Sequence, residues 1–239
     1  MSFAQRAFHF FQTLAQDQPI IPASLHIKII NPYCDAAVME AVQAFLFRYY
    51  DDDNPRVLIA GINPGRYGGG LTGISFTDPV ALRHHCDIDH RLKKRQELSS
   101  SFIYRVIEHM GGASRFFQTF FLTALCPLGF LRNGRNYNYY DDPRLLQAVS
   151  EFIEKTFMKQ VQLGVRRDVF VVLGGDKNFR MAQRLNDKYR WFERLLALEH
   201  PRFIMQYRRR HLSHFVNRYV EQLSALIPSG QTTTYGSKT

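Results

Sequence analysis

The stretch RVLIAGINPGRYGGGLTGISF, Arg56 to Phe76, passes from an apolar run into a turn that holds six of the chain's fifteen glycines. Its first residues are typical of a buried strand. Glycine turns after such strands often bind phosphate. This one matches neither the dinucleotide fingerprint nor the P-loop, because Arg66 stands where a P-loop needs its second glycine. We therefore expect a pocket of another kind, or else a turn whose glycines serve backbone geometry alone.

The rest of the chain alternates between helical and strand-like segments. Periodicity and capping signals predict helices over residues 1–16, 36–50, 98–110, 141–164, 176–188 and 213–226, and another that begins at Asp78-Pro79. Besides the run at residue 56, strands are expected within residues 116–125, 168–173 and 195–201. Strands that alternate with long helices favour right-handed crossovers and a parallel sheet.

Ligands of open α/β sheets lie beyond the carboxyl ends of the strands. Here those ends are 61–65, 125–129, 174–175 and 200–201, which lie in the segments GINPG, LCPLGF, GGDK and EHP. We expect these segments to converge on one cleft.

The chain is basic: 31 Lys and Arg against 21 Asp and Glu give a formal net charge of +10. This balance favours a polyanionic partner, and two clusters, 91–95 and 208–210, concentrate it. Taken alone, cluster 91–95 is better explained as a solvated face. No apolar run is long enough for a membrane span and the N-terminus lacks a secretory signal, so a cytoplasmic protein is expected.

The three cysteines, Cys34, Cys86 and Cys126, are widely spaced and predict neither a disulfide framework nor a metal site. We expect reduced thiols, with Cys126 in the core. His211 and His214 are three residues apart, but nothing else supports metal binding. No metal or other cofactor is expected.

Candidate pocket residues lie in and opposite the glycine turn. The Asn63 amide could accept a hydrogen bond from a water and orient it. Gly65 would leave an open slot, and Phe76 would offer a stacking face. His200, at the end of the last predicted strand, could donate to negative charge on a leaving group, although a lone histidine is more often structural.

These residues resemble the motifs of the uracil-DNA glycosylase superfamily, and above all its single-strand-selective monofunctional branch. That branch has G-M-N-P-G-P-F-G-x-x-x-T-G-x-P-F; this chain has Gly61-Ile62-Asn63-Pro64-Gly65-Arg66-Tyr67-Gly68, then Thr72-Gly73 and Phe76. A second block, 125–136, resembles the family's N-L-C-P-L-x-F…G-R-N, and His200-Pro201 resembles its second motif. The resemblance covers residues 25–227 and implies a three-layer α/β/α fold around a four-stranded, mainly parallel sheet.

The resemblance also implies site roles. Asn63 would position the attacking water, Phe76 would stack on a flipped-out base, and His200 would stabilise the departing base. The backbone around Gly61, Ile62, Pro64 and Gly65 would contact that base, and the bare Gly65 would admit 5-substituted bases. The implied enzyme is a monofunctional DNA glycosylase of base excision repair that leaves an abasic site, with no Schiff-base lysine.

The chain departs from the family at two places. Ala124 replaces the family Asn that reads the base edge, so we expect weaker uracil selectivity and tolerance for hypoxanthine or xanthine. The second departure follows His200-Pro201. The family motif continues there with Ser-Pro-Arg-Asn, whereas this chain continues with the basic and apolar stretch 202–210. We expect Arg66, Arg202, Phe203, Arg208, Arg209 and Arg210 to contact DNA, with an apolar wedge filling the gap left by the base. Alternatively, this stretch begins a strand or helix in which Phe203 and Met205 are buried.

Two other functions fit the same residues. The chain could be a non-catalytic nucleic-acid-binding protein with a relict pocket, or a nucleoside hydrolase of similar fold. The basic stretch after His200 argues against the second. We expect a monomer with a single domain over residues 1–227, a polar disordered tail over residues 228–239, and DNA, single- or double-stranded, as partner.

Overall fold

A computed structural model describes residues 1–228; the predicted tail lies outside the described residues except for Pro228. The α-helices are α1 Phe3–Leu14, α2 Ala36–Tyr49, α3 Gly69–Thr72, α4 Pro79–His84, α5 Leu98–His109, α6 Ala113–Thr119, α7 Pro143–Val161, α8 Asp176–Tyr189, α9 Pro201–Tyr207 and α10 Leu212–Ser224. Short 3₁₀ turns span Ala23–Leu25, Pro32–Cys34 and Arg209–His211. The strands are β1 Ile27–Ile30, β2 Arg56–Gly61, β3 Phe120–Ala124, β4 Gly129–Arg132, β5 Arg135–Tyr137, β6 Val165–Leu173 and β7 Arg194–Leu198.

The central sheet has four strands in the order β3-β2-β6-β7, and all neighbours are parallel. This confirms the predicted fold class. Every residue of β2 is buried, as its unbroken apolar run indicates. Gly61 at the end of β2 pairs in register with Ala124 at the end of β3, so the glycine turn begins beside the segment that leaves β3.

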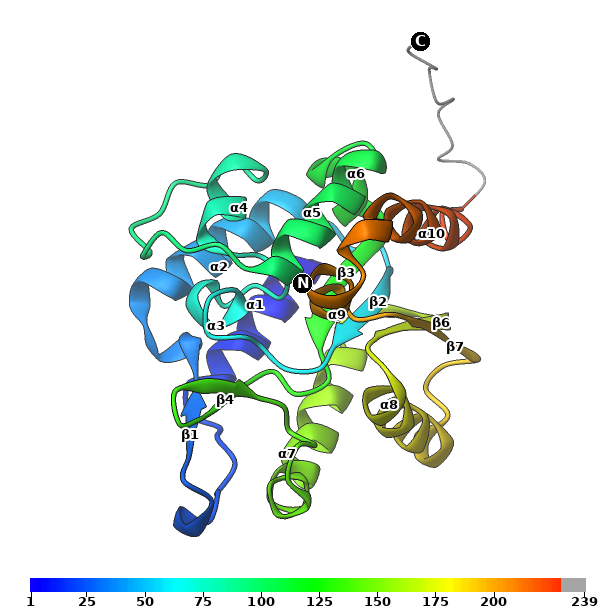
Figure 1. The fold of residues 1–239 in the computed structure, drawn as a ribbon. Helices are drawn as coiled ribbons and strands as arrows, with labels where there is room; N and C mark the ends of the chain where they lie inside the picture. The colour runs from blue at the N-terminus through cyan, green and yellow to red at the C-terminus, as the bar shows by residue number, and fades with distance from the viewer. Residues whose placement is uncertain (229–239) are drawn as a thin grey trace.

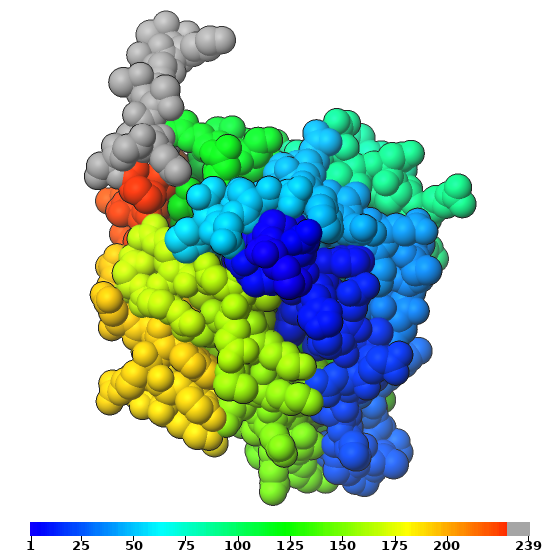
Figure 2. All heavy atoms as spheres, turned by 180° about the vertical axis from the view of Figure 1, so that it is seen from behind, coloured from blue at the N-terminus to red at the C-terminus, as the bar shows by residue number. Residues whose placement is uncertain are grey.

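Helices cover both faces of this sheet (Figures 1 and 2). The chain steps from β2 to β3 in one direction and from β3 through β6 to β7 in the other, so right-handed crossovers place α5 and α7 on opposite faces. Helices α1, α7 and α8 form one layer, and α5, α9 and α10 form the other. Phe157 of α7 packs on Phe170 of β6, with ring centroids 5.2 Å apart. The three predicted layers are therefore present.

A second, antiparallel sheet of order β1-β4-β5 lies beside the glycine turn and was not predicted. The β4–β5 hairpin turns at Asn133 and Gly134, whose φ angles are +50° and +72°. Two successive residues of positive φ are the geometry of a type I′ hairpin turn, for which Asn-Gly is the preferred pair. The Asn-Gly dipeptide was thus a legible signal for this hairpin.

The predicted strand over residues 116–125 is only half right. Its first part, through Thr119, belongs to α6, and the strand begins at Phe120. Phe116 and Phe117 have strand propensity, but both are fully packed within the helical layer. Tertiary packing here overrides local propensity.

The helix predicted over residues 1–16 is present as α1. Its buried face includes the five residues expected there, Phe3, Ala7, Phe10, Phe11 and Leu14.

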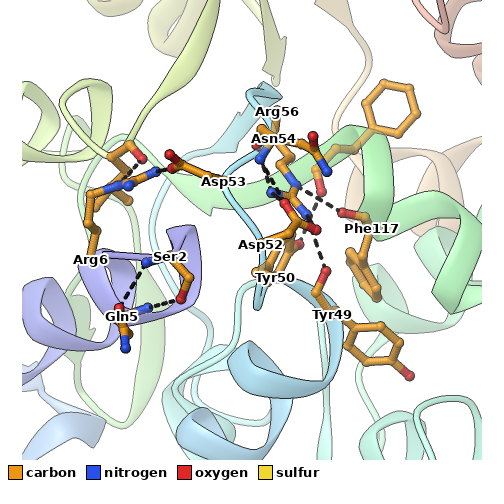
Figure 3. A network of polar contacts seen from close by, with 12 residues as sticks. Ser2, Gln5, Arg6, Tyr49, Tyr50, Asp52, Asp53, Asn54, Arg56 and Phe117 are labelled. Carbon is orange, nitrogen blue, oxygen red and sulfur yellow. Dashed lines mark hydrogen bonds and ion pairs between the residues drawn. The ribbon is translucent and has the colours of Figure 1, made fainter.

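At the amino end of β2, a fully buried arginine ties three segments together (Figure 3). The Arg56 guanidinium forms an ion pair with Asp52 at 2.5 Å and also donates to the carbonyl oxygens of Asn54 and Phe117. Burial opposes the charge on Asp52, but hydrogen bonds from Arg56 and Asn54 outweigh it and hold its pKa below the ordinary value. This network anchors β2 at the end opposite the glycine turn.

One hydrophobic core runs from Phe3 to Leu226. The predicted core position of Cys126 is confirmed, since its side chain is fully buried, and all three thiols are free. Among the helices of the described residues, none is both long and apolar enough to cross a membrane.

Candidate active site

The glycine turn folds back so that Phe76 lies against Gly61. A Cβ built on Gly61 would come within 2.4 Å of Cζ of Phe76, so only glycine allows this approach. Phe76 itself has a φ of +57°, a strained value for an aromatic residue. The Thr72 hydroxyl supports the turn by donating to the Thr77 carbonyl at 2.6 Å and accepting from the Ile74 N–H at 3.1 Å. The turn from Gly61 to Phe76 therefore holds the Phe76 ring in one position.

The Asn63 side chain is fixed by two backbone hydrogen bonds. Its Oδ1 accepts from the Tyr139 N–H at 3.1 Å, and its Nδ2 donates to the Tyr137 carbonyl at 3.2 Å. Because one bond needs an acceptor and the other a donor, they determine which way the amide faces. The carbonyl oxygen keeps a second lone pair that can accept a hydrogen bond from water.

The β4–β5 hairpin provides these contacts because it approaches the turn closely. A Cβ on Gly129 would lie 2.5 Å from the Pro64 carbonyl oxygen, so glycine is required where β4 begins. On the far side of the hairpin, the Asn136 side chain accepts from the Arg66 N–H at 3.1 Å. The unpredicted small sheet is therefore what holds the turn and Asn63 in place.

His200 caps the amino end of α9, and this contact sets its tautomer. Its Nδ1 accepts a hydrogen bond from the Arg202 N–H at 3.1 Å, so the proton of the neutral ring lies on Nε2. Burial lowers the pKa of His200 to about 4, and the nearby Arg202 cation acts in the same direction. At neutral pH the residue is an uncharged ring with one N–H donor. Its ring lies 6.0 Å from that of Phe76, centroid to centroid.

These residues surround one cavity beyond the carboxyl ends of β2, β3 and β7. Of the predicted site residues, the cavity wall contains Gly61, Ile62, Asn63, Pro64, Gly65, Phe76, Ala124, His200 and Arg202. Sequence reasoning missed further polar residues of the wall: Ser75, Glu97, Ser99, Asn136 and Asn138. Of these five residues, only Asn136 had a signal in the sequence, because it ends the Gly134-Arg135-Asn136 part of the block that resembles the family.

Two predicted segments are not part of the cavity. Residues 125–129 do not line it, although Ala124 just before them does, and Gly174 and Gly175 after β6 do not line it either. Instead, Asn178 of α8 closes this end of the sheet by donating to the Leu173 carbonyl and accepting from the buried Tyr139 hydroxyl. The expectation that all four segments converge on one cleft is therefore wrong for residues 125–129 and for the segment after β6.

The open slot expected beside Gly65 is filled. A Cβ built on Gly65 would come within 2.2 Å of Oε1 of Glu97, and one on Gly68 within 2.0 Å of Oε2. The carboxyl group of Glu97, from the segment before α5, thus occupies the space that the two glycines leave. Sequence reasoning could not foresee this contact, because 29 residues separate Glu97 from Gly68.

Ala124 lies in the wall with only 4% of its surface exposed, and its methyl group supplies no polar contact. Its carbonyl oxygen accepts a hydrogen bond from the buried Gln160 side chain at 3.2 Å. At this end of β3, Ala124 thus offers the cavity no side-chain amide of the kind that the family Asn provides. The polar groups of the wall come from other segments.

The stretch after His200 forms α9 rather than an extended loop. Ile204 and Met205 are buried, whereas Phe203 and Tyr207 are 42% and 68% exposed. The alternative that this stretch begins a strand or helix with Phe203 and Met205 buried is thus right for a helix and for Met205, and wrong for Phe203. Phe203 and Tyr207 pack together with centroids 5.5 Å apart, and the Arg208 guanidinium lies 5.6 Å from the Phe203 ring. Arg208, Arg209 and Arg210 are all exposed.

A basic groove opens next to the cavity. Arg66, Tyr67, Gln96, Glu97, Leu98, Arg135, Asn136 and Arg202 line it, and three of these residues also line the cavity. The guanidinium groups of Arg66 and Arg95 lie 4.5 and 5.8 Å from the ring of Tyr67. Arg95 belongs to cluster 91–95, which the sequence alone favoured as a solvated face. Through its contact with Tyr67, this end of the cluster lies beside the groove.

No group of three or more His, Cys, Asp or Glu side chains within residues 1–228 could hold a metal ion. The pair His211 and His214, singled out in the sequence, thus lacks further ligands among the described residues. The chemical groups of the cavity are amides, hydroxyls, one carboxyl, one imidazole and the guanidinium of Arg202.

Comparisons with known proteins agree on one family. A model described as the uracil DNA glycosylase superfamily matches residues 47–224. No curated protein matches the chain. A solved structure, wild-type SMUG2 of Pedobacter heparinus, is 41% identical in sequence and superposes with a TM-score of 0.89. The match covers 95% of this chain and 98% of that one.

Proposed function

Because the chain belongs to the uracil DNA glycosylase superfamily, we propose that it is a monofunctional DNA glycosylase. It would hydrolyse the N-glycosidic bond of a deaminated base flipped out of DNA and leave an abasic site. The observation that carries this proposal is that a fixed amide, Asn63, and a neutral imidazole, His200, share one cavity with the Phe76 ring. Family membership supports glycosylase chemistry, and the cavity supplies groups suited to it.

In this reaction the C1′–N bond breaks and its electron pair leaves with the base. The sugar gains positive charge, and water then adds to C1′ and loses a proton. Asn63 would accept a hydrogen bond from that water through the free lone pair of Oδ1. Since both other amide contacts are backbone bonds, the water would meet an acceptor already in place.

His200 would stabilise the departing base. Its Nε2–H can donate to a carbonyl oxygen on which negative charge builds, and a well-placed donor of this kind contributes about 3–4 kcal/mol. The bond from Arg202 to Nδ1 keeps the proton on Nε2. A neutral donor requires no proton transfer before the base leaves.

A flipped base would stack on Phe76, at a cost of a few kcal/mol for leaving the DNA stack. Of the described residues that line the cavity, none is a lysine. Water rather than an amine would therefore be the nucleophile, and the product would be an intact strand with an abasic site.

DNA would lie over the basic rim of the cavity. Arg66 and Arg202 border its mouth, and Arg208, Arg209 and Arg210 follow α9. Exposed Phe203, which packs against Tyr207, is the proposed wedge for the gap left by the base. We further propose that the protein acts as a monomer, since one chain supplies every group used here.

Uracil is the first proposed substrate, with hypoxanthine and xanthine as further ones because Ala124 offers no amide. A 5-substituted uracil would need the Glu97 carboxyl to move, since it fills the space beside Gly65. The selectivity proposed here is for deaminated bases as a class.

An abasic-site assay tests the proposal. The wild-type protein should convert DNA with a single uracil into alkali-sensitive product, whereas Asn63→Ala should still bind that DNA but release little base. A wild-type protein that binds and releases nothing would instead support a relict pocket. Strong competition by free nucleosides would point to a nucleoside hydrolase.

A further inference from the structure

The Glu97 carboxyl is the one acidic group in the cavity wall of the described chain. It spans the space beside two glycines, since a Cβ on Gly65 or Gly68 would overlap one or other of its oxygens. It shares the wall with Asn63 and His200. Any base that enters the cavity must therefore meet this carboxyl or displace it.

The backbone of Glu97 is held so that its side chain is directed to the cavity. Its N–H donates to Oδ2 of the buried Asp78 at 2.8 Å, while Oδ1 of Asp78 caps α4 through the Ala81 N–H. Glu97 is itself the N-cap residue of α5, yet its side chain does not bond to that helix. A residue at this position commonly uses its side chain as the cap, so the carboxyl of Glu97 is left for other contacts.

Burial raises the pKa of Glu97 to about 7. The Arg202 cation on α9 acts to lower it and the Asp78 carboxylate at the start of α4 acts to raise it. The other titratable groups that line the cavity and the adjoining groove are His200, Arg66, Tyr67 and Arg135. Near neutral pH the carboxyl is thus present both as an acid, which can donate a hydrogen bond, and as a carboxylate, which can only accept.

Resting on the proposed function, we propose that Glu97 is the specificity residue of this cavity: its carboxyl contacts the base and takes the place of the amide that Ala124 lacks. Deamination replaces an exocyclic amino donor by a carbonyl acceptor. The acid form of Glu97 donates to such a carbonyl, whereas the carboxylate form repels it. The acid form therefore favours deaminated bases, and Asn136 and Asn138 complete the polar wall.

The test compares wild type with Glu97→Gln and Glu97→Ala. Single-turnover base release is measured between pH 5.5 and 8.5 on DNA with one uracil or one hypoxanthine. A carboxyl of pKa about 7 gives a fall of about tenfold in wild-type rate between pH 6 and 8. Glu97→Gln keeps a donor at every pH, so its rate should stay level. Glu97→Ala should be slower at low pH and change the uracil-to-hypoxanthine ratio.

Glu151→Gln is the matched control, because Glu151 is exposed on α7 on the other side of the sheet and should keep the wild-type profile. Thermal melting of each variant checks the fold. If Glu97→Gln keeps the wild-type pH profile and base ratio, the role of Glu97 is overturned while the glycosylase stands. If the wild type releases no base from any DNA, the proposed function and this inference both fall.

Discussion

Oδ1 of Asn63 accepts a hydrogen bond from the backbone N–H of Tyr139 at 3.1 Å. The partner bond, from Nδ2 of Asn63 to the Tyr137 carbonyl at the end of β5, completes a clamp between the glycine turn and the chain where it leaves the β4–β5 hairpin. A residue predicted to orient water is thus itself oriented by main-chain atoms, whose positions do not depend on side-chain rotamers.

The clamp predicts that Asn63→Asp is no conservative change. The new carboxylate can still accept from Tyr139, but it sets a second oxygen against the Tyr137 carbonyl. We expect single-turnover uracil release to fall by about 10²- to 10³-fold. Asn217→Asp, exposed on α10, is the control. Near wild-type release by Asn63→Asp would show that the amide contact to Tyr137 is dispensable.

His200 should remain neutral well below its ordinary pKa of 6.5. Nitrogen NMR should find the Nε2–H tautomer down to about pH 5, because burial lowers its pKa to about 4. His200→Ala should slow base release by about 10²- to 10³-fold. A cationic ring at pH 6 would contradict the proposed neutral donor.

The lowered pKa of His200 also makes the stability of the protein depend on pH. Between pH 6.5 and about 4 the unfolded chain takes up a proton at this residue that the folded chain does not. The free energy of unfolding should therefore fall as pH drops through this window. In His200→Ala, chemical denaturation should show a shallower fall over the same range.

Gly61→Ala should disturb the cavity without disrupting the fold. Its Cβ would lie 2.4 Å from Cζ of Phe76 and force that ring to move. We expect base release to drop by roughly tenfold or more, as in a variant that has lost its oriented stacking group. Gly175→Ala is the matched control, because its Cβ would meet no atom within 4 Å. Equal rates for the two variants would argue against a role for the Phe76 ring.

Charge reversal of Arg208, Arg209 or Arg210 should weaken DNA binding and flatten its salt dependence. Each lost phosphate contact lowers the log–log salt slope by about 0.9 on duplex DNA or about 0.7 on single strands. Phe203→Ala should instead slow base release and leave the slope unchanged. Lys155→Glu, on α7 on the far face, should leave both quantities unchanged. An unaltered salt slope in the arginine variants would show that these arginines do not contact DNA.

Arg56→Met should lower the free energy of unfolding by about 2–3 kcal/mol, because it leaves the Asn54 and Phe117 carbonyl oxygens without their donor and removes an ion pair whose Asp52 side chain is 40% exposed. Urea denaturation measures the change. The matched control is Arg83→Met, whose pair with Asp89 is exposed and should contribute less than about 1 kcal/mol. Similar losses for both would show that burial adds nothing at Arg56.

The sheet and much of the cavity were predictable because they depend on local patterns. An apolar run and its glycines mark β2 and the turn, and His200-Pro201 marks the end of β7 and the start of α9. Gly61 could be recognised as a turn glycine, although the ring that requires it lies 15 residues away.

The remaining features depend on contacts between distant segments. Glu97 reaches Gly65 only because Asp78 holds its backbone beside α4, and no spacing in the sequence reveals that. Phe116 joins α6 against its strand propensity because the helical layer buries it. The hairpin that clamps Asn63 differs, because its turn depends on a local signal, the Asn133-Gly134 pair, which the sequence alone contains.

The most direct test of the account is a panel of single- and double-stranded oligonucleotides, each with one uracil, hypoxanthine or xanthine. Released base and abasic sites are both measured, before and after alkali. We predict stoichiometric base release with the strand intact until alkali is added, and a loss of that release in Asn63→Ala despite retained binding. Binding without any base release by the wild-type protein would contradict the central claim.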